Sequence, residues 1–284
     1  MNLNKSVVVV GVLIASALSG CNLSDSKFSD SQKEQIGTIA GDYIVSHPEV
    51  LIKASQELRK QQMQAQDNVM KQTSLKFADK LTNDKRTPFV GDVKASVSVV
   101  EFFDYQCIFC SKISSKMNEL QKANPDVKFV YKETPIFSSQ WGTSGYAADV
   151  GNWVFATKGS DAYSKYHEGV FNTGKNEGRL QLSDVDAVAQ TVGMTKAELA
   201  KMPKGSYSDT FGLFGALGLQ GTPAVIVMPT DNVKSVDDIS VIRGFNPKAV
   251  ESAIAKLKTE LSNRVEAPAI VKAVAVTSAA VPTK

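Results

Sequence analysis

Two cysteines separated by two residues, Cys107 and Cys110, are the side chains of this sequence best suited to covalent chemistry. They follow a buried-strand pattern at Val97–Phe103 and stand where a helix that runs to about Lys122 is predicted to begin. Unpaired backbone N–H groups at a helix start stabilise a thiolate, which is the nucleophilic form of cysteine. A second thiol one turn later can attack a mixed disulfide formed at the first. The spacing therefore predicts thiol–disulfide exchange.

The cysteine count favours reactivity over structural stabilisation. The chain of 284 residues contains one further cysteine, Cys21. A bridge between Cys107 and Cys110 would close a loop too short to remove much entropy from the unfolded chain. We expect no cofactor other than this redox-active disulfide. We also expect no metal, because a Cys₂His₂ zinc site would need both histidines, His47 and His167, and we expect His167 to lie on a helix surface.

The composition excludes several other classes of function. With 43% apolar and 21% charged residues, the chain has the composition of an ordinary globular protein. The formal net charge of +3 provides no basic surplus, so nucleic acid is not expected as a partner. The sequence also lacks a phosphate-binding loop, a Ser-His-Asp set and a nucleotide-binding fingerprint.

The first twenty residues are typical of an export signal, with Lys5 before an apolar run at 7–14 that is too short to span a bilayer. Leu18–Cys21 resembles the bacterial lipobox. This resemblance implies that Cys21 becomes the lipidated first residue of a protein held at the periplasmic face of a membrane. The alternatives are an ordinary signal peptide and an uncleaved anchor. Asn22, in place of aspartate, gives a weak preference for the outer membrane.

An N-terminal helical segment is predicted from apolar residues at helical spacing. The first stripe ends at His47-Pro48, and a longer helix follows with a sparse stripe among many Gln, Lys and Glu residues. A long helix with so thin a stripe needs a partner for stability, so we expect a homo-oligomer that forms through these helices. The alternative is a solvated helix that lies on its own domain. The first stripe consists of Ile36, Ile39, Ala40, Tyr43 and Ile44.

The rest of the chain predicts an α/β domain. A second strand at Val127–Lys132 completes a β-α-β unit around the cysteines. A mainly helical stretch at about 139–219 precedes two strands, Ala224–Met228 and Ile239–Arg243, and a final helix to about Leu261. The predicted segments are a signal peptide at 1–20, a tether at 21–30, an oligomerisation stalk at 31–82, the α/β domain at 88–262 and a flexible tail at 265–284.

Two motifs resemble one known family. Glu101–Cys110, with the sequence EFFDYQCIFC, resembles the active-site strand and turn of the DsbA-like periplasmic thiol–disulfide oxidoreductases, and Gly221–Val225 resembles their cis-proline loop. The resemblance covers about Pro88–Leu261. His47–Leu51 resembles the subgroup that oligomerises through an N-terminal extension. The resemblance implies an α/β, thioredoxin-like fold with an inserted helical subdomain, preceded by an N-terminal helical stalk.

The resemblance also implies roles for individual residues. Cys107 would be the nucleophile, Cys110 the resolving thiol and Glu101 a buried acid that exchanges a proton with Cys110. Thr222 and the cis-proline Pro223 would bind an extended substrate strand. The alternatives are a structural Glu101 that faces solvent and a trans proline that opens an edge strand.

Departures from the family pattern bear on the direction of the reaction. Ile108 and Phe109 stand where the strongest oxidants have Pro and His, so a cation that would favour the Cys107 thiolate is missing. Thr222 before the proline resembles the DsbC-type isomerases. We therefore expect an isomerase, reductase or dual-function enzyme. We expect Asp104 to cap the turn or to face water.

The expected partners are unfolded or misfolded exported proteins that contain cysteines, together with a membrane redox partner. Two other functions remain open from the sequence. One is a disulfide-donating oxidase of the DsbA type. The other is a non-catalytic lipoprotein scaffold or holdase in which the Cys107–Cys110 bridge is a permanent clip.

Overall fold

The computed structural model describes the backbone of residues 28–278 and the side chains of residues 28–264. The chain forms two compact units, one that ends at Lys60 and one that begins at Gln61. The predicted signal peptide, the predicted lipidation site Cys21 and most of the predicted tether lie outside the described residues, so they stay predictions. No helix in the described part of the chain has the length and the apolar character needed to cross a membrane.

The first unit is helical, as its apolar stripe predicted. Helix α1 spans Asp30–Ser46 and ends before Pro48, and α2 spans Glu49–Lys76 and continues into the second unit. No side chain of α1 is buried. Within the first unit, these helices expose a series of large apolar side chains, namely Ile36, Ile39, Tyr43, Val45, Leu51, Ile52 and Leu58.

A five-stranded mixed sheet forms the centre of the second unit, with the strand order β1-β3-β2-β4-β5. Strands β2 and β3 are parallel, and each other neighbouring pair is antiparallel. The parallel pair is joined by a crossover helix, as the β-α-β prediction required. The strands are Phe89–Val90 (β1), Val97–Phe103 (β2), Val127–Glu133 (β3), Ala224–Pro229 (β4) and Ser240–Arg243 (β5).

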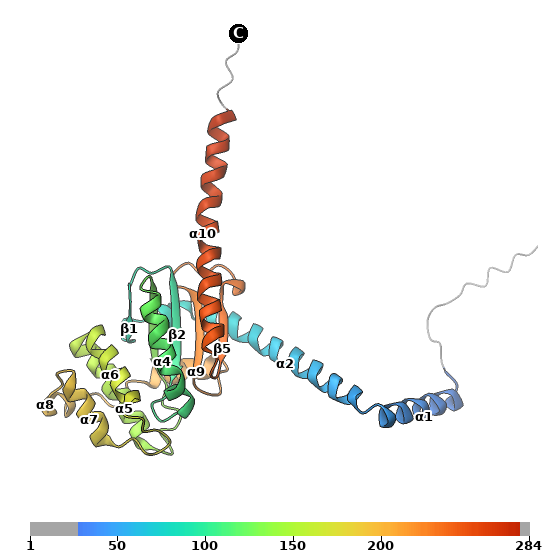
Figure 1. Cartoon of the computed structure of the whole chain (residues 1–284), viewed down its shortest axis with the longest axis horizontal. Coiled ribbons are helices and arrows are strands. Elements are labelled where there is room, and N and C mark those ends of the chain that lie inside the picture. Colours follow the sequence, from blue (N-terminus) through green and yellow to red (C-terminus); the bar gives the residue numbers. More distant parts are fainter. Residues whose placement is uncertain (1–27, 279–284) are drawn as a thin grey trace, which may run out of the picture. The chain divides into compact units, whose positions relative to one another are not determined.

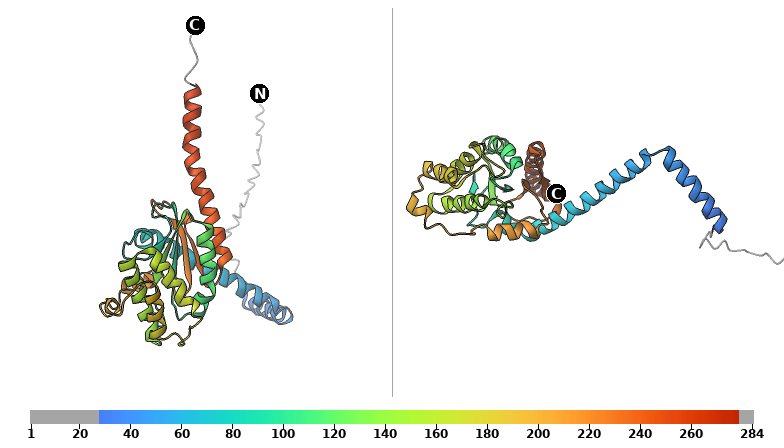
Figure 2. Two further views of the ribbon diagram at one scale, coloured as in Figure 1. Left: turned by 60° about the vertical axis from the view of Figure 1, so that its left-hand side comes forward. Right: turned by 90° about the horizontal axis from the view of Figure 1, so that it is seen from below.

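Helices cover both faces of this sheet (Figures 1 and 2). On one face, helix α4 (Ile108–Ala123) and helix α10 (Pro247–Ser278) bury apolar side chains in one core cluster with β2 and β3. On the other face, helix α9 (Ser208–Ala216) shares a second cluster with helix α3 (Ala78–Thr82) and with Met70 of α2. Because helices cover both faces, every residue of β2, β3 and β4 is buried.

A helical insert separates β3 from β4, where the sequence predicted a mainly helical stretch. Its aromatic side chains, including Tyr163 and Tyr166, belong to the same core cluster as Phe103 and both cysteines. The insert therefore packs directly against the strand and turn that carry the thiols. Its helices before α9 are α5 (Gly142–Lys158), α6 (Ser160–Asn172), α7 (Leu182–Thr191) and α8 (Lys196–Leu199).

The C-terminal helix is longer than predicted. The sequence analysis ended it near Leu261 and assigned 265–284 to a flexible tail, whereas α10 continues to Ser278. That prediction was wrong for residues 265–278. Alanine recurs through this segment and has the highest intrinsic helix propensity, and each residue added to an existing helix gains a backbone hydrogen bond.

Candidate active site

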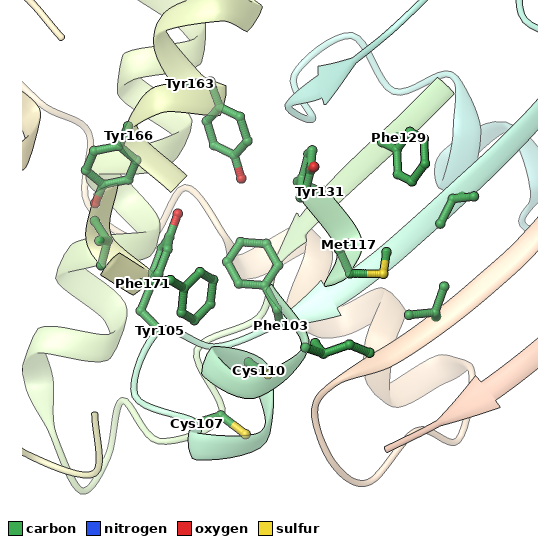
Figure 3. Packing of buried hydrophobic residues seen from close by; sticks show 14 of the residues in the cluster. Phe103, Tyr105, Cys107, Cys110, Met117, Phe129, Tyr131, Tyr163, Tyr166 and Phe171 are labelled. Atoms are coloured by element: carbon green, nitrogen blue, oxygen red, sulfur yellow. The ribbon is translucent and has the colours of Figure 1, made fainter. Parts of the chain in front are cut away.

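The start of α4, directly after the turn that follows β2, carries both cysteines (Figure 3). Cys107 is the N-cap residue of α4, and Cys110 lies in its first turn. The Cys107 N–H donates to the Asp104 carbonyl oxygen at 3.0 Å, and the Ser111 N–H donates to the Cys107 carbonyl oxygen at 3.0 Å. The predicted position of the pair at a helix start is therefore confirmed.

Asp104 fixes the shape of this turn. Its carboxylate accepts hydrogen bonds from the N–H groups of Gln106 at 2.8 Å and Phe137 at 2.9 Å, and from the Ser144 hydroxyl at 2.8 Å. Asp104 is buried, so it caps the turn and does not face water. Burial raises the pKa of this carboxyl group, while the three hydrogen bonds act in the opposite direction.

The Cys107 thiol is unusually acidic. Its pKa is lowered to about 6, chiefly by a hydrogen bond from the Cys110 thiol. The backbone N–H groups of Phe109 and Cys110 add to this effect, and burial opposes it. At neutral pH, Cys107 is therefore mostly in the thiolate form that attacks disulfides.

Cys110 has the opposite character. It is fully buried, and its pKa is raised well above the ordinary value by burial and by the neighbouring Cys107. Cys107 retains 4% of its surface exposed, whereas Cys110 retains none. Both residues are free thiols in this structure. The outer sulfur is therefore the more readily ionised of the two, and the inner sulfur is protonated at neutral pH.

The loop before β4 lies against Cys107. Its Thr222–Pro223 peptide bond is cis, as the family resemblance implied, so the alternative of a trans proline is wrong. In its protonated form, the Cys107 thiol donates to the Thr222 carbonyl oxygen at 3.3 Å. The fold therefore brings two motifs that are 115 residues apart into contact.

Glu101 lies on β2 between Val99 and Phe103, which belong to the same core cluster as the cysteines. Side chains alternate along a strand, so Glu101 points to the same face of the sheet. It is only 3% exposed, so the alternative of a solvent-facing Glu101 is wrong. Burial raises its pKa to about 8, and its Oε2 atom has no hydrogen-bond partner among the described residues. Such a carboxyl group can both take up and release a proton near neutral pH.

His167 is buried, and the prediction that it lies on a helix surface was wrong. Its ring centroid lies 4.6 Å from those of Phe103 and Tyr131. Burial lowers its pKa to about 3, and within residues 28–264 neither ring nitrogen has a hydrogen-bond partner. The signal was present in the sequence, because His167 continues a helical stripe with Tyr163, Tyr166, Val170 and Phe171.

Glu133, at the end of β3, is a buried acid that the sequence analysis did not single out. Its Oε1 atom accepts hydrogen bonds from the hydroxyls of Tyr105 at 3.0 Å and Tyr163 at 2.9 Å. Burial raises its pKa well above the ordinary value. Tyr105 precedes the cysteine pair and Tyr163 belongs to α6, so Glu133 connects the active-site turn to the helical insert. Its strand-end position gave no sequence signal for this contact.

This arrangement is suited to sulfur chemistry. An acidic outer thiol lies beside a protonated inner thiol, and a carbonyl oxygen and a buried carboxyl group lie on the same side of the sheet. These groups suffice for attack on a disulfide and for resolution of the resulting mixed disulfide. Among the described side chains, no group of three or more His, Cys, Asp or Glu residues is placed to hold a metal ion.

Two family models match this chain. The model for the DSBA-like thioredoxin domain matches residues 98–245, which include both cysteines and the cis-proline. The model for the copper resistance protein ScsC N-terminal domain matches residues 32–65, in α1 and the first part of α2. No curated protein matches the chain.

Solved structures that are similar to this chain agree with the two family models. BcfH from Salmonella enterica Typhimurium has 36% identity and a TM-score of 0.72, and the alignment covers 80% of this chain and 96% of that one. A thioredoxin-like oxidoreductase from Silicibacter pomeroyi has 25% identity and a TM-score of 0.52, with coverage of 64% and 97%. A linker-deletion mutant of Proteus mirabilis ScsC shares the fold at 18% identity, a TM-score of 0.55 and coverage of 84% and 100%. This chain therefore belongs to the DSBA-like thioredoxin family of thiol–disulfide oxidoreductases and has an ScsC-type N-terminal segment.

Proposed function

We propose that this protein rearranges and reduces disulfides in exported proteins, with Cys107 as nucleophile and Cys110 as resolving thiol. The observation that carries the proposal is the state of the two sulfurs. Cys107 caps a helix, has a pKa of about 6 and lies 3.3 Å from the Thr222 carbonyl oxygen, while Cys110 is buried and protonated behind it. A permanent structural clip would need none of these features.

The reaction begins when the Cys107 thiolate attacks a substrate disulfide. A sulfur–sulfur bond forms between Cys107 and one substrate sulfur, and the other substrate sulfur leaves as a thiolate. In isomerisation, that substrate thiolate attacks a different substrate disulfide and forms a new bond there. The substrate thiolate displaced from that disulfide then attacks the substrate sulfur of the mixed disulfide, which releases the Cys107 thiolate unchanged. In reduction, Cys110 attacks the Cys107 sulfur, so the substrate leaves with two thiols and the protein holds the Cys107–Cys110 disulfide.

Glu101 would serve the resolving step. Cys110 must lose its proton before it can attack, and its burial opposes ionisation. Glu101 points to the same face of the sheet and has a pKa of about 8, so its ionised form can accept that proton in a region that excludes water. The reverse transfer would protonate the Cys110 thiolate when the disulfide is reduced again.

The net direction of exchange is proposed from the residues around the sulfurs. Ile108 and Phe109 supply no cation to Cys107, and Thr222 precedes the cis-proline as in the isomerases that the sequence resembles. Reduced protein should therefore reactivate a scrambled multi-disulfide substrate. If it fails to do so, and the oxidised protein instead rapidly oxidises dithiol peptides, the second candidate, a DsbA-like oxidase, replaces this proposal.

Alkylation rates distinguish both enzyme functions from a non-catalytic scaffold or holdase. A thiol with a pKa of about 6 stays largely ionised at pH 6, where a free cysteine is almost fully protonated. Cys107 should therefore react with iodoacetamide much faster than free cysteine at that pH. Equal rates would support the scaffold function.

The N-terminal helices are proposed to assemble the protein into a homo-oligomer. Their apolar side chains are more than half exposed at Ile39, Tyr43, Leu51 and Leu58, and α1 buries no side chain of its own. Such faces are stable in water when a second copy covers them. Sedimentation of Leu51→Glu together with Leu58→Glu should give a smaller particle than the unmodified chain. Lys53→Glu, which is exposed on the same helix, is the matched control.

The location and partners follow from the same proposal. Cys21 would carry a lipid that holds the protein on the periplasmic face of a membrane, with a weak preference for the outer membrane. Its substrates would be misfolded exported proteins with cysteines, and a membrane redox partner would restore the dithiol. Metabolic labelling with a fatty acid should label the native chain but not Cys21→Ala.

A further inference from the structure

The peptide group that joins Gln106 to Cys107 is held on two sides. Its N–H group donates to the Asp104 carbonyl oxygen at 3.0 Å, which closes the turn after β2. Its carbonyl oxygen, which belongs to Gln106, accepts a hydrogen bond from the Glu177 N–H group at 2.9 Å. Glu177 lies in the helical insert, between α6 and α7. The orientation of the peptide group directly before the nucleophile therefore depends on the insert.

The Gln106 side chain adds two hydrogen bonds to the same segment of the insert. Its Oε1 atom accepts from the Gly178 N–H group at 2.9 Å, and its Nε2 atom donates to the Leu180 carbonyl oxygen at 3.2 Å. Gln106 is fully buried, so water does not compete for these bonds. We call the three bonds between Gln106 and residues 177–180 the Gln106 latch.

The backbone of residues 177–180 is held in an unusual conformation. Glu177 has a φ of 51°, in the left-handed region that is unfavourable for a residue with a Cβ atom. Gly178 follows with a φ of 84°, and a Cβ atom there would lie 2.7 Å from Nε1 of Trp141. Trp141 thus closes one side of the segment, while Gln106 bonds to it. A strained backbone persists where its surroundings fix it, and the latch supplies part of that fixation.

The direction of the Gln106 carbonyl group matters for the thiolate beside it. The Cys110 thiol and the backbone N–H groups of Phe109 and Cys110 stabilise the Cys107 thiolate. A carbonyl oxygen carries a partial negative charge, so one that turned toward the sulfur would oppose ionisation. Because the Gln106 carbonyl oxygen is bonded to Glu177, it is directed toward the insert. The latch therefore preserves a surrounding for the sulfur in which donors predominate.

We infer that Gln106 is a positioning residue for disulfide exchange, and that the helical insert sets the reactivity of Cys107 through the Gln106 latch. The inference rests on the proposed function. It gives the insert a part in the reaction in addition to its packing against the sheet. A displacement of residues 177–180 would then change the rate of reaction at Cys107 without contact with either sulfur.

The test measures how the alkylation of Cys107 by iodoacetamide depends on pH in the reduced, full-length protein. The parent should show a midpoint at about pH 6. Gln106→Leu removes both side-chain bonds of the latch, so the midpoint should rise by about one pH unit and the rate at pH 6 should fall about fivefold. Gly178→Ala should act in the same direction, because the added Cβ atom would push the segment away from Trp141. It tests the inference even if Gln106→Leu does not fold.

The matched control is Gln181→Leu. The Gln181 side chain donates to the carbonyl oxygens of Gly178 at 3.2 Å and Arg179 at 3.4 Å, so this variant also removes two bonds to the same segment. Both bonds lie within the insert, and the midpoint should stay at the parent value. Hydrogen exchange checks the latch directly, because the amide of residue 178 should exchange faster in Gln106→Leu and in Gly178→Ala than in the parent.

The possible outcomes separate the two levels of the proposal. If the midpoint stays at about pH 6 in Gln106→Leu and Gly178→Ala, or rises equally in Gln181→Leu, the positioning role of Gln106 is overturned and the enzyme is left intact. If instead the parent shows the midpoint of free cysteine, about 8.5, the proposed function itself is overturned.

Discussion

Alternate residues of β2 and β3 point to opposite faces of the sheet, and their buried polar groups have different partners on the two faces. On the face covered by α3 and α9, Ser98 exchanges a hydrogen bond with Thr230 at 2.8 Å. Lys128 donates to the Thr82 carbonyl oxygen at 2.7 Å, and Lys132 donates to the Lys80 carbonyl oxygen at 2.6 Å. The two lysines thereby attach α3 to the sheet, and the Ser98–Thr230 pair joins β2 to the end of β4.

The face that carries the cysteines leaves its buried polar groups incompletely bonded. Glu101 and Glu133 each have one carboxyl oxygen without a hydrogen-bond partner among the described residues, and both ring nitrogens of His167 are in the same condition. Unsatisfied buried groups cost stability, so they persist where they serve another purpose. In the described part of the chain, the buried polar groups are therefore fully paired on one face of the sheet and incompletely paired on the other, where the proposed proton and sulfur chemistry would take place.

The largest effect should come from the cysteines themselves. Cys107→Ser should lower the rate of dithiol exchange by roughly 10³-fold or more, because it removes the nucleophile. Cys110→Ser should retain attack but lose resolution, so a mixed disulfide with substrate should accumulate on non-reducing gels. Equal trapping by both variants would contradict the assignment of distinct roles.

Glu101 should make the free energy of unfolding fall as the pH becomes alkaline. Its pKa rises from 4.5 to about 8 on folding, so the folded state binds the proton more tightly and stability is lost as pH rises through that window. Over the whole window the loss amounts to about 5 kcal/mol, at about 1.4 kcal/mol per pKa unit. Denaturant melts of Glu101→Gln between pH 5 and pH 8.5 should lack this loss.

The control for Glu101→Gln is Glu119→Gln, which changes an exposed carboxyl group at the surface of α4. It should keep the pH dependence of the parent. If Glu101→Gln also keeps it, Glu101 is not the group that takes up the proton on folding.

The variant Lys132→Met tests the hydrogen bonds on the face of the sheet that α3 and α9 cover. Lys132→Met removes hydrogen bonds to the Lys80 carbonyl oxygen at 2.6 Å and to the Thr87 hydroxyl at 2.9 Å, and leaves the Thr87 hydroxyl buried without this donor. Because a charged donor is lost, the free energy of unfolding should fall by about 2 kcal/mol. Lys80→Met, at an exposed side chain whose backbone carbonyl is unchanged, should cost less than about 0.5 kcal/mol. The exchange rate with small dithiols should stay at the parent value in both variants.

His167 should produce the smallest effect at neutral pH. Its pKa is lowered to about 3 by burial, so it contributes stability above pH 6.5 that is lost as pH falls toward 3. His167→Phe should reduce the loss of stability in that acid range and change stability at neutral pH by no more than about 1 kcal/mol. If urea melts show the same loss of stability between pH 6.5 and pH 3 in His167→Phe as in the parent, this imidazole does not take up a proton on unfolding. His47→Phe, at an exposed histidine, is the control.

Local chemistry was predictable from the sequence. The strand before Cys107 and the helix that starts at the cysteine pair each depend on residues close together in the chain, and capping by Asp104 was one of two alternatives that the sequence left open. The cis peptide bond at Pro223 followed from a family resemblance, because a short motif carries it. These features are set by backbone propensity, side-chain alternation and turn chemistry, which act over a few residues.

Contacts between distant segments were decided by the tertiary structure. His167 continues the apolar stripe of α6, which was a signal for burial, but the sequence did not show which side chains would enclose it, namely aromatic rings from β2 and β3. The sequence did not show that Glu133 would accept hydrogen bonds from hydroxyl groups of the active-site turn and of α6. It also did not show that α2 would lie beside the cis-proline loop. The sequence determined which groups could react. Only packing determined which of them lost water and gained a partner, because desolvation depends on every segment that surrounds a side chain.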